Sequence, residues 1–159
     1  MSTDPVFTIL PATWRDMGEL TALEQACFDQ DAWPWWDVLG TLTLPGVTRL
    51  KAVVDGRMAG FAAVDPRPRE NVAWITTIGV LPEFRRQGIA RALLLECERA
   101  VSLPAIKLCT RISNQPAIAL YQASGYQRVN VWSRYYVGGE DALVLQKNLP
   151  AVGDTQPAN

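Results

Sequence analysis

Residues 77–94 constrain the fold of this chain more than any other stretch, because they join an apolar strand to an amphipathic helix through a basic glycine turn. Residues 75–81 are apolar and rich in β-branched side chains, as in a buried strand, and Pro82 ends them. After Arg86, apolar residues recur three and four positions apart, which is the spacing of one helix face. The pattern predicts a strand, a turn and a helix in that order.

The turn itself suits an anionic ligand. Arg85, Arg86, Gln87 and Gly88 precede a helix whose first N–H groups have no partner within the helix and whose dipole is positive at this end. Gly88 has no side chain, so a ligand can approach its backbone. These features favour a phosphate or pyrophosphate. The chain contains neither G-x-x-x-x-G-K-[ST] nor G-x-G-x-x-G, the patterns of two other phosphate-binding turns.

Length and composition predict one globular domain. The chain has 159 residues, of which 48% are hydrophobic and 19% charged, which is enough to bury a core without disulfides or metal. We expect the domain to span residues 1–149, and residues 150–159 to form a disordered tail because they show no periodicity. The net charge of −1 favours neither nucleic acid nor a membrane surface as a partner.

Cysteine and histidine usage narrows the compartment and the chemistry. Cys27, Cys97 and Cys109 are far apart without a C-x-x-C pair, and no apolar stretch has the length of a membrane span or the form of a signal peptide. We therefore expect the reducing cytoplasm. The chain has no histidine and no cysteine cluster, so no metal site is expected. Acid and base chemistry must use Asp, Glu, Tyr, Cys or solvent.

Hydrophobic periodicity and turn residues predict the other elements. Strands are expected at residues 7–10, 49–54, 58–64, 71–81, 106–112, 126–136 and 142–147. Helices are expected at residues 14–28, before Pro45, over residues 86–102, and between Asn114 and Gly125. Because a crossover helix precedes it, the strand at 106–112 is expected to pair in parallel with residues 75–81.

Short local signals support these boundaries. Thr13 can cap the first helix, with Asp16 completing a capping box. Asp55 and Gly56 favour a tight type I′ hairpin, and Asn114 is a good N-cap for the helix that follows it.

The predicted order of elements, β-α-α-β-β-β-α-β-α-β-β, resembles the GNAT superfamily of acyl-CoA N-acyltransferases. Residues 85–90 match the family's Q/R-x-x-G-x-G/A pyrophosphate loop, and Asn114 with residues 119–126 matches its second signature. The resemblance covers residues 7–149. It implies an α/β (α+β) fold, in which a mixed, mostly antiparallel central sheet is flanked by about four helices.

Within this superfamily the chain is similar to the RimI-type ribosomal-protein N-terminal acetyltransferases. The similarity rests on four short segments, at residues 28–35, 78–80, 134–136 and 140–142. It implies an N-acetyltransferase that moves acetyl from acetyl-CoA to a primary amine, with a protein N-terminus as the leading acceptor. A small-molecule amine acceptor and a non-catalytic acyl-CoA-binding or regulatory domain remain alternatives. The implied enzyme is a cytoplasmic monomer or homodimer.

The resemblance also implies which residues hold acetyl-CoA. Backbone groups of the turn would hold the pyrophosphate, and main-chain groups of residues 78–80 would bind the pantetheine arm and polarise the thioester. The implied cofactor-binding residues are Ile78, Gly79, Val80, Arg85, Arg86, Gln87, Gly88, Ile89, Ala90, Arg91, Asn114 and Tyr121. A tight strand-to-helix turn and a helix cap at Asn114 are the structural alternatives.

Tyr121 is implied to be the general acid that protonates the departing CoA thiolate. A phenol of pKa ~10 protonates a thiolate of pKa ~8.5 at a cost of about 2 kcal/mol, so we expect the site to lower the pKa of this tyrosine. A core tyrosine on the apolar face of its helix is the structural alternative.

One position departs from the RimI pattern. Where those enzymes carry a glutamate general base on the fifth strand, this chain has Cys109. We interpret it as a small buried thiol, with an acyl-enzyme nucleophile as the alternative. Glu70, Asp65 and Glu140 are substitutes for the base that the sequence does not rank.

The missing base favours an acceptor of low pKa. An α-amine of pKa ~8 is roughly one-tenth neutral at pH 7, whereas a lysine amine of pKa ~10.4 is neutral about once in several thousand. Trp35, Trp74 and Tyr135 are the candidates for the acceptor pocket, and core packing is the alternative for each.

Overall fold

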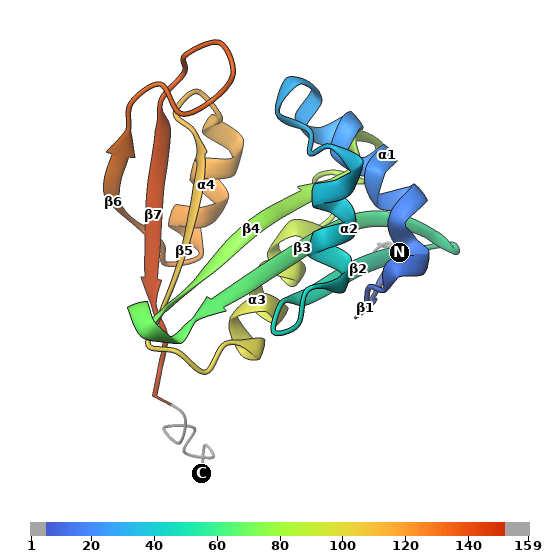
Figure 1. Ribbon diagram of the computed structural model, residues 1–159, viewed down its shortest axis with the longest axis horizontal. Coiled ribbons are helices and arrows are strands. Elements are labelled where there is room, and N and C mark those ends of the chain that lie inside the picture. Colours follow the sequence, from blue (N-terminus) through green and yellow to red (C-terminus); the bar gives the residue numbers. More distant parts are fainter. Residues whose placement is uncertain (1–5, 152–159) are drawn as a thin grey trace, which may run out of the picture. The chain divides into compact units, whose positions relative to one another are not determined.

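The computed structural model describes residues 6–151, which divide into two compact units (Figure 1). The first unit holds the chain up to Asp65 together with Ile75–Cys97, and the second holds Pro66–Trp74 and the chain from Glu98 onward. The prediction of a single domain over residues 1–149 stays a prediction. Most of the predicted tail, residues 152–159, lies outside the described residues.

Seven strands and four α-helices make up the described chain. The strands are β1 (Thr8–Pro11), β2 (Thr48–Val54), β3 (Arg57–Arg67), β4 (Val72–Val80), β5 (Ala105–Arg111), β6 (Gln127–Trp132) and β7 (Ala142–Asn148). The helices are α1 (Met17–Phe28), α2 (Trp35–Thr43), α3 (Ile89–Ala100) and α4 (Gln115–Ala123). Short 3-10 turns occupy Trp14–Asp16, Asp29–Asp31, Pro68–Glu70 and Pro82–Phe84. Among these residues no helix is both long and apolar enough to cross a membrane.

Hydrogen bonds connect the strands in the order β1-β2-β3-β4-β5-β7-β6. β1–β2, β2–β3, β5–β7 and β6–β7 pair antiparallel. β4 and β5 pair in parallel inside the second unit, through Ala73 with Ile106 and Trp74 with Lys107. The predicted fold class and the parallel direction are therefore confirmed, although the paired residues lie just before the predicted 75–81.

The core of the first unit lies under α1 and α2. Leu20 and Leu23 of α1, and Val38 and Leu42 of α2, are buried with Phe61 of β3. α3 lies on the opposite face of the sheet formed by β3 and its neighbours (Figure 1). A Cβ at Gly60 would come within 3.1 Å of Ile89 and 3.0 Å of Leu93, so glycine lets α3 approach β3 closely.

In the second unit, Glu98 joins the last turn of α3 to two other segments. Its carboxylate accepts a hydrogen bond from the Tyr126 hydroxyl at 3.0 Å and forms an ion pair with Lys147 of β7 at 3.0 Å. Tyr126 is fully buried at the end of α4. These contacts hold Glu98, Tyr126 and Lys147 together within the second unit.

Local signals set most boundaries as predicted. Thr13 N–H donates to Asp16 at 2.8 Å and Arg15 N–H donates to Thr13 at 3.3 Å, which confirms the capping box. Asp55 and Gly56 have φ of 48° and 77°, as the type I′ hairpin requires.

Three predicted boundaries are wrong. The strand predicted over residues 58–64 runs on to Arg67. The helix of the basic turn begins at Ile89 rather than Arg86, because Arg86 and Gly88 take positive φ. The strand predicted over residues 126–136 ends at Trp132, because Arg134 takes φ 52° and its N–H bonds the Asp141 carboxylate at 2.9 Å. Tyr135 therefore lies in the β6–β7 loop.

Candidate functional site

The turn between β4 and α3 is anchored at its start. The Val80 carbonyl, the last of β4, accepts hydrogen bonds from the Arg85 guanidinium at 2.9 Å and the Cys27 thiol at 3.3 Å. Leu81 N–H donates to the Ala59 carbonyl at 2.8 Å. Arg85 thus folds back on the strand, so its side chain shapes the turn.

The backbone of the turn has the conformation of an anion site. Arg86 and Gly88 take φ of 61° and 82°, and such reversals of backbone hand turn successive N–H groups toward one point. The first hydrogen bond of α3 runs from Ala92 N–H to the Gly88 carbonyl at 3.0 Å, so the N–H groups before Ala92 have no partner within the helix. A Cβ at Gly88 would meet nothing within 4 Å, which leaves room for a phosphate. The turn therefore fits the pyrophosphate of coenzyme A.

Gly79, in the segment implied to bind the pantetheine arm, has a structural reason to be glycine. A Cβ there would lie 3.2 Å from both the Cys27 sulfur and the Phe28 ring. The end of α1 therefore packs directly on the backbone of β4, beside Ile78 and Val80.

Asn114 and Tyr121 lie on α4 in the second unit. The Asn114 side chain accepts a hydrogen bond from Ala117 N–H at 3.4 Å and caps the helix, as predicted. Tyr121 is 7% exposed, with its ring 6.0 Å from that of Tyr126. Burial raises the pKa of the Tyr121 hydroxyl well above its usual value, and nearby Cys109 raises it further. The expected lowering is therefore wrong, because burial destabilises the phenolate.

Cys109 lies on β5 in partial burial. Its sulfur accepts a hydrogen bond from the Tyr136 hydroxyl at 3.7 Å. Burial raises the pKa of this thiol, and this effect outweighs the hydrogen bonds from Tyr136 and Tyr135, which lower it. The thiol is therefore protonated at neutral pH, which supports the interpretation as a buried thiol over the nucleophile.

The three candidate bases have different surroundings. Glu140 is bound by Ser113 and by Arg111 at 3.0 Å, and these hydrogen bonds lower its pKa. Glu70 is exposed and lies 4.0 Å from Arg67. Asp65 is the one of the three that lines a cavity.

The candidate acceptor residues divide between the units. In the second unit, Trp74 stacks on Trp132 with centroids 5.5 Å apart, and Tyr135 contacts the same ring at 5.2 Å. Trp132, which sequence reasoning missed, therefore brings these two candidates together. Trp35 is 56% exposed in the first unit and contacts Trp36 edge-on at 5.8 Å.

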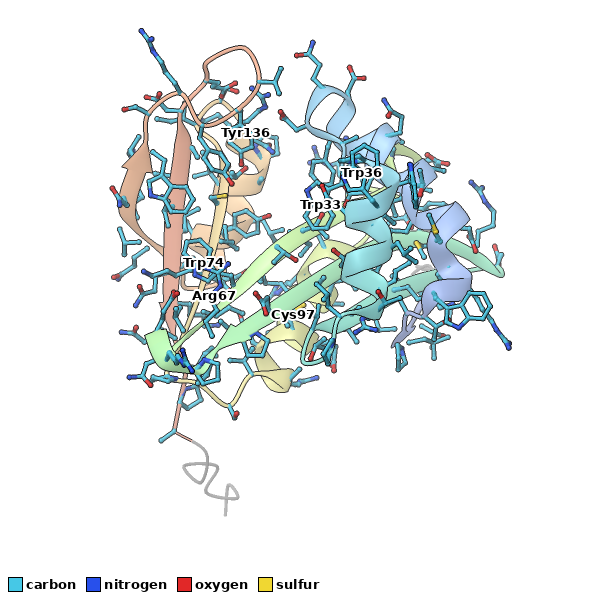
Figure 2. The ribbon with its side chains drawn as sticks, viewed as in Figure 1. Trp33, Trp36, Arg67, Trp74, Cys97 and Tyr136 are labelled. Carbon is cyan, nitrogen blue, oxygen red and sulfur yellow. The ribbon has the colours of Figure 1, made fainter. Side chains whose placement is uncertain are left out.

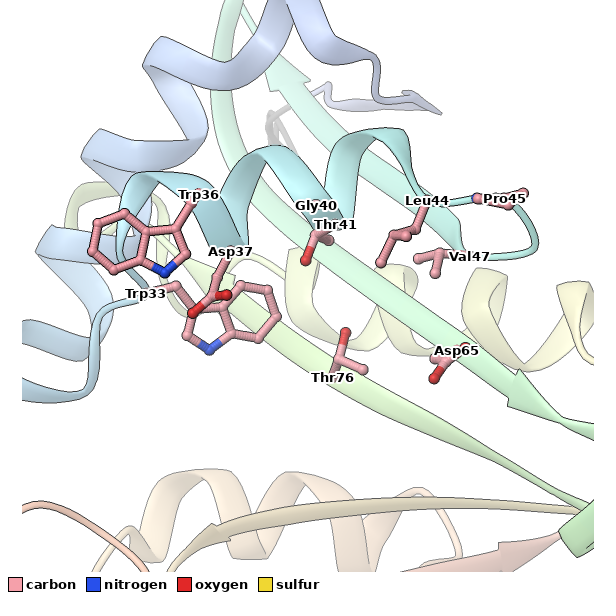
Figure 3. Close-up of a pocket in the computed structure, with 10 residues that line it drawn as sticks. All are labelled: Trp33, Trp36, Asp37, Gly40, Thr41, Leu44, Pro45, Val47, Asp65 and Thr76. Atoms are coloured by element: carbon pink, nitrogen blue, oxygen red, sulfur yellow. The ribbon is translucent and has the colours of Figure 1, made fainter.

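The first unit contains a cavity of about 460 Å³ that sequence reasoning also missed. Figure 3 shows it along one face of α2, from which Trp36, Asp37, Gly40 and Thr41 line it, followed by Leu44 just after the helix. Trp33, Val47, Asp65 and Thr76 lie among the residues that complete the wall. The spacing 36, 40, 44 and 37, 41 marks one helix face and was a signal in the sequence.

A buried carboxylate supports this wall. Glu24 of α1 is 1% exposed and accepts hydrogen bonds from the Thr77 hydroxyl at 2.8 Å and the Trp33 backbone. Burial raises its pKa, although both hydrogen bonds lower it. A glutamate on the apolar stripe of α1 was the sequence signal for this contact.

Among residues 6–151 no group of three His, Cys, Asp or Glu side chains could hold a metal ion.

Known proteins resemble the chain in sequence and in fold. Residues 8–126 match the acetyltransferase (GNAT) family. The N-alpha-acetyltransferase RimI of Mycobacterium tuberculosis is 33% identical over 150 residues, covering 92% of this chain and 94% of the relative. The ribosomal protein bS18-alanine N-acetyltransferase of Salmonella typhimurium is 34% identical over 152 residues, covering 87% and 90%. The crystal structure of the ribosomal-protein-S18-alanine N-acetyltransferase from Escherichia coli superimposes with a TM-score of 0.82 at 26% identity, covering 96% of this chain and all of that one.

The fold, the anion-binding turn and these relatives together define an acyl-CoA N-acetyltransferase. The chain belongs to the acetyltransferase (GNAT) family, with RimI enzymes among its relatives. Its cofactor is acetyl-CoA, as expected from the sequence. The relatives favour this enzyme over a non-catalytic acyl-CoA-binding domain.

Proposed function

We propose that this enzyme acetylates the α-amine of a protein N-terminus. The observation that carries the proposal is the similarity, over most of both chains, to relatives named for N-terminal acetylation. This chain has Cys109 where RimI-type enzymes carry a glutamate general base, and the missing base also supports the proposal. An α-amine is roughly one-tenth neutral at pH 7, so it needs a base far less than a lysine amine does. The enzyme acts in the cytoplasm as a monomer or homodimer, without nucleic acid or a membrane.

Acetyl-CoA is held by backbone groups in this proposal. The N–H groups of residues 86–91 bind the pyrophosphate, and Gly88 leaves space for it. Main-chain groups of Ile78 and Val80 bind the pantetheine arm and polarise the thioester carbonyl. Since the Val80 carbonyl already accepts from Arg85 and Cys27, we assign the N–H of Val80 to the cofactor. Asn114 contacts the pantetheine arm in addition to capping α4.

Tyr121 supplies the proton for the leaving group. The amine nitrogen forms a bond to the acetyl carbon, the carbon–sulfur bond breaks, and the phenolic proton passes to the CoA sulfur. The raised pKa keeps Tyr121 protonated until the thiolate leaves, and it makes the proton transfer cost more than the ~2 kcal/mol of an ordinary phenol. The amine loses a proton to solvent or to a carboxylate, and solvent returns a proton to the Tyr121 oxygen, which restores the donor. Trp74 and Tyr135, joined by Trp132, and Trp35 contact the acceptor.

The test uses peptides that separate the possible acceptors. One peptide has a free N-terminus and no lysine, the second has a blocked N-terminus and one lysine, and a panel of small amines completes the set. CoA release is measured as free thiol, and mass spectrometry locates the acetyl group. We expect transfer to the free N-terminus only. Comparable transfer to the lysine peptide or to a small amine would overturn the proposal.

A further inference from the structure

The cavity under α2 has a defined shape and origin. The apolar residues Val38 and Leu42 hold α2 in the core, so the opposite face of the helix is free to form a wall. Trp36 and Asp37 lie near the beginning of α2, and Asp65 lies near its end (Figure 3). At about 460 Å³ the cavity is large enough to take a long side chain.

Charged residues of a single sign line this cavity. Its ten lining residues include two carboxylates, Asp37 from α2 and Asp65 from β3, and no lysine or arginine. The hydroxyls of Thr41 and Thr76 are the other polar side chains in the wall. A cavity with this lining attracts a cation and repels an anion.

Two indoles add a second kind of attraction for a cation. Trp33 is half-buried, and Glu24 holds its backbone, while Trp36 is 59% exposed, and both side chains lie beside α2 (Figure 2). The face of an indole attracts an ammonium or guanidinium group. Their apolar rings also suit the methylene stem that carries such a group.

Gly40 shows that the fold does not dictate the width of the cavity. It lies within α2, where glycine is less stable than alanine. A Cβ at this position would meet only Leu44, at 4.0 Å, so neither packing nor a positive φ requires glycine. Glycine here keeps the cavity wide.

We propose that this cavity binds a basic side chain, lysine or arginine, of the acceptor polypeptide. The inference rests on the proposed acetylation of protein N-termini and names the acceptors that the enzyme prefers. The carboxylates of Asp37 and Asp65 and the ring faces of the two tryptophans select the basic side chain.

The first test moves one arginine through an alanine-rich peptide with a free N-terminus. At one position among the first few residues, we expect arginine to raise kcat/KM about five- to tenfold over citrulline, its uncharged analogue. Lysine at that position should match arginine, and norleucine should resemble citrulline. No gain at any position, or an equal gain from norleucine, would overturn the proposal.

The second test assigns the gain to the cavity. In Asp37→Asn and in Asp65→Asn, the ratio of kcat/KM between the arginine and citrulline peptides should fall at least threefold. Asp55→Asn is the matched control, since it removes the same charge from the β2–β3 hairpin. If both cavity variants keep the full ratio, or if Asp55→Asn lowers it equally, the cavity is not the site.

A binding measurement separates this inference from the proposed function. Calorimetry compares N-acetylated arginine and citrulline peptides, which need no transfer reaction, on the wild-type protein and on Asp65→Asn. We expect the arginine peptide to bind about fivefold more tightly to the wild type only. Selective binding without N-terminal transfer would refute the function and keep the cavity's preference, whereas transfer without selective binding would refute the cavity.

Discussion

The turn before α3 and the cavity under α2 lie in the same unit but offer ligands different groups. The turn is seven consecutive residues, 85–91, whose backbone N–H groups are proposed to bind the cofactor. The cavity draws its side chains from residues 33–76, on α2, β3 and β4. Backbone recognition depends on local conformation, whereas side-chain recognition depends on tertiary packing. The turn can therefore be recognised in the sequence, whereas the cavity cannot.

The largest effect is expected at Tyr121, which is proposed to act after both ligands are bound. Tyr121→Phe should lower kcat by about 100-fold or more while the affinity for CoA stays nearly unchanged, because only the proton donor is lost. Steady-state kinetics with a titration of CoA measures both. Tyr126→Phe is the control, since it removes another buried hydroxyl and costs stability of about 1 kcal/mol without touching the reaction. An unaltered kcat in Tyr121→Phe would remove this residue from the mechanism.

The role of the turn is tested by comparing Gly88 with Gly56, since both glycines have positive φ. Gly88→Ala and Gly56→Ala both place a Cβ at positive φ with nothing within 4 Å, so each should cost about 1–2 kcal/mol of stability. Only Gly88→Ala should raise the KM for acetyl-CoA, by about tenfold, because its Cβ occupies the space of the phosphate. Thermal unfolding and acetyl-CoA kinetics give the two readouts. Equal effects of both variants on KM would mean that strain alone matters.

The cavity wall is tested through Glu24. Its raised pKa means that the folded protein binds the proton more tightly than the unfolded chain, so this stabilisation is present in acid and is lost as pH rises through the folded pKa. Glu24→Gln removes the buried charge. The Tm of the variant relative to wild type should therefore be about 2–4 °C more favourable at pH 8 than at pH 5. A difference that is constant with pH would show that Glu24 carries no such cost.

Asp16 provides the opposite case for comparison. Burial alone would raise its pKa, but the ion pair with Lys51 at 2.8 Å and the Thr13 hydrogen bond lower it. Its contribution is thus present above the unfolded pKa and lost in acid. Asp16→Asn should lower the Tm more at pH 7 than at pH 3.

The smallest effect is expected at Gly40. Gly40→Ala should stabilise the protein by up to about 1 kcal/mol, because α2 gains helix propensity. It should also raise the KM for a basic acceptor peptide about threefold, because a methyl group narrows the cavity. Gly18→Ala in α1 has the same open surroundings and should leave that KM unchanged. A Gly40→Ala variant with unaltered KM would show that ligands do not reach this wall.

Local chemistry explains which elements could be predicted. The capping box of Thr13 and the hairpin at Asp55 depend on neighbours within three residues, and both are confirmed. The start of α3 was placed three residues early, because αL conformation at a non-glycine residue such as Arg86 has no clear sequence signal. The raised pKa of Tyr121 was missed for a different reason, since burial is a property of the assembled unit.

The spacing along α2 marks one wall of the cavity in the sequence, but the other walls could not be predicted because α2 meets β3 and β4 only after folding. The sequence indicates Trp35 as a candidate for the acceptor pocket, whereas its neighbours Trp33 and Trp36 line the cavity. Asp65 stood among three unranked carboxylates until the cavity separated it from Glu70 and Glu140.

The one-sided wall of α2 has an evolutionary consequence. Val38 and Leu42 on one face keep the helix in place, while Trp36 and Gly40 on the other face line the cavity. Exchanges on that outer face alter which acceptors fit and leave the cofactor turn intact. Acceptor specificity can therefore evolve through substitutions in a single helix. Libraries randomised at those positions offer a direct route to enzymes with new acceptors.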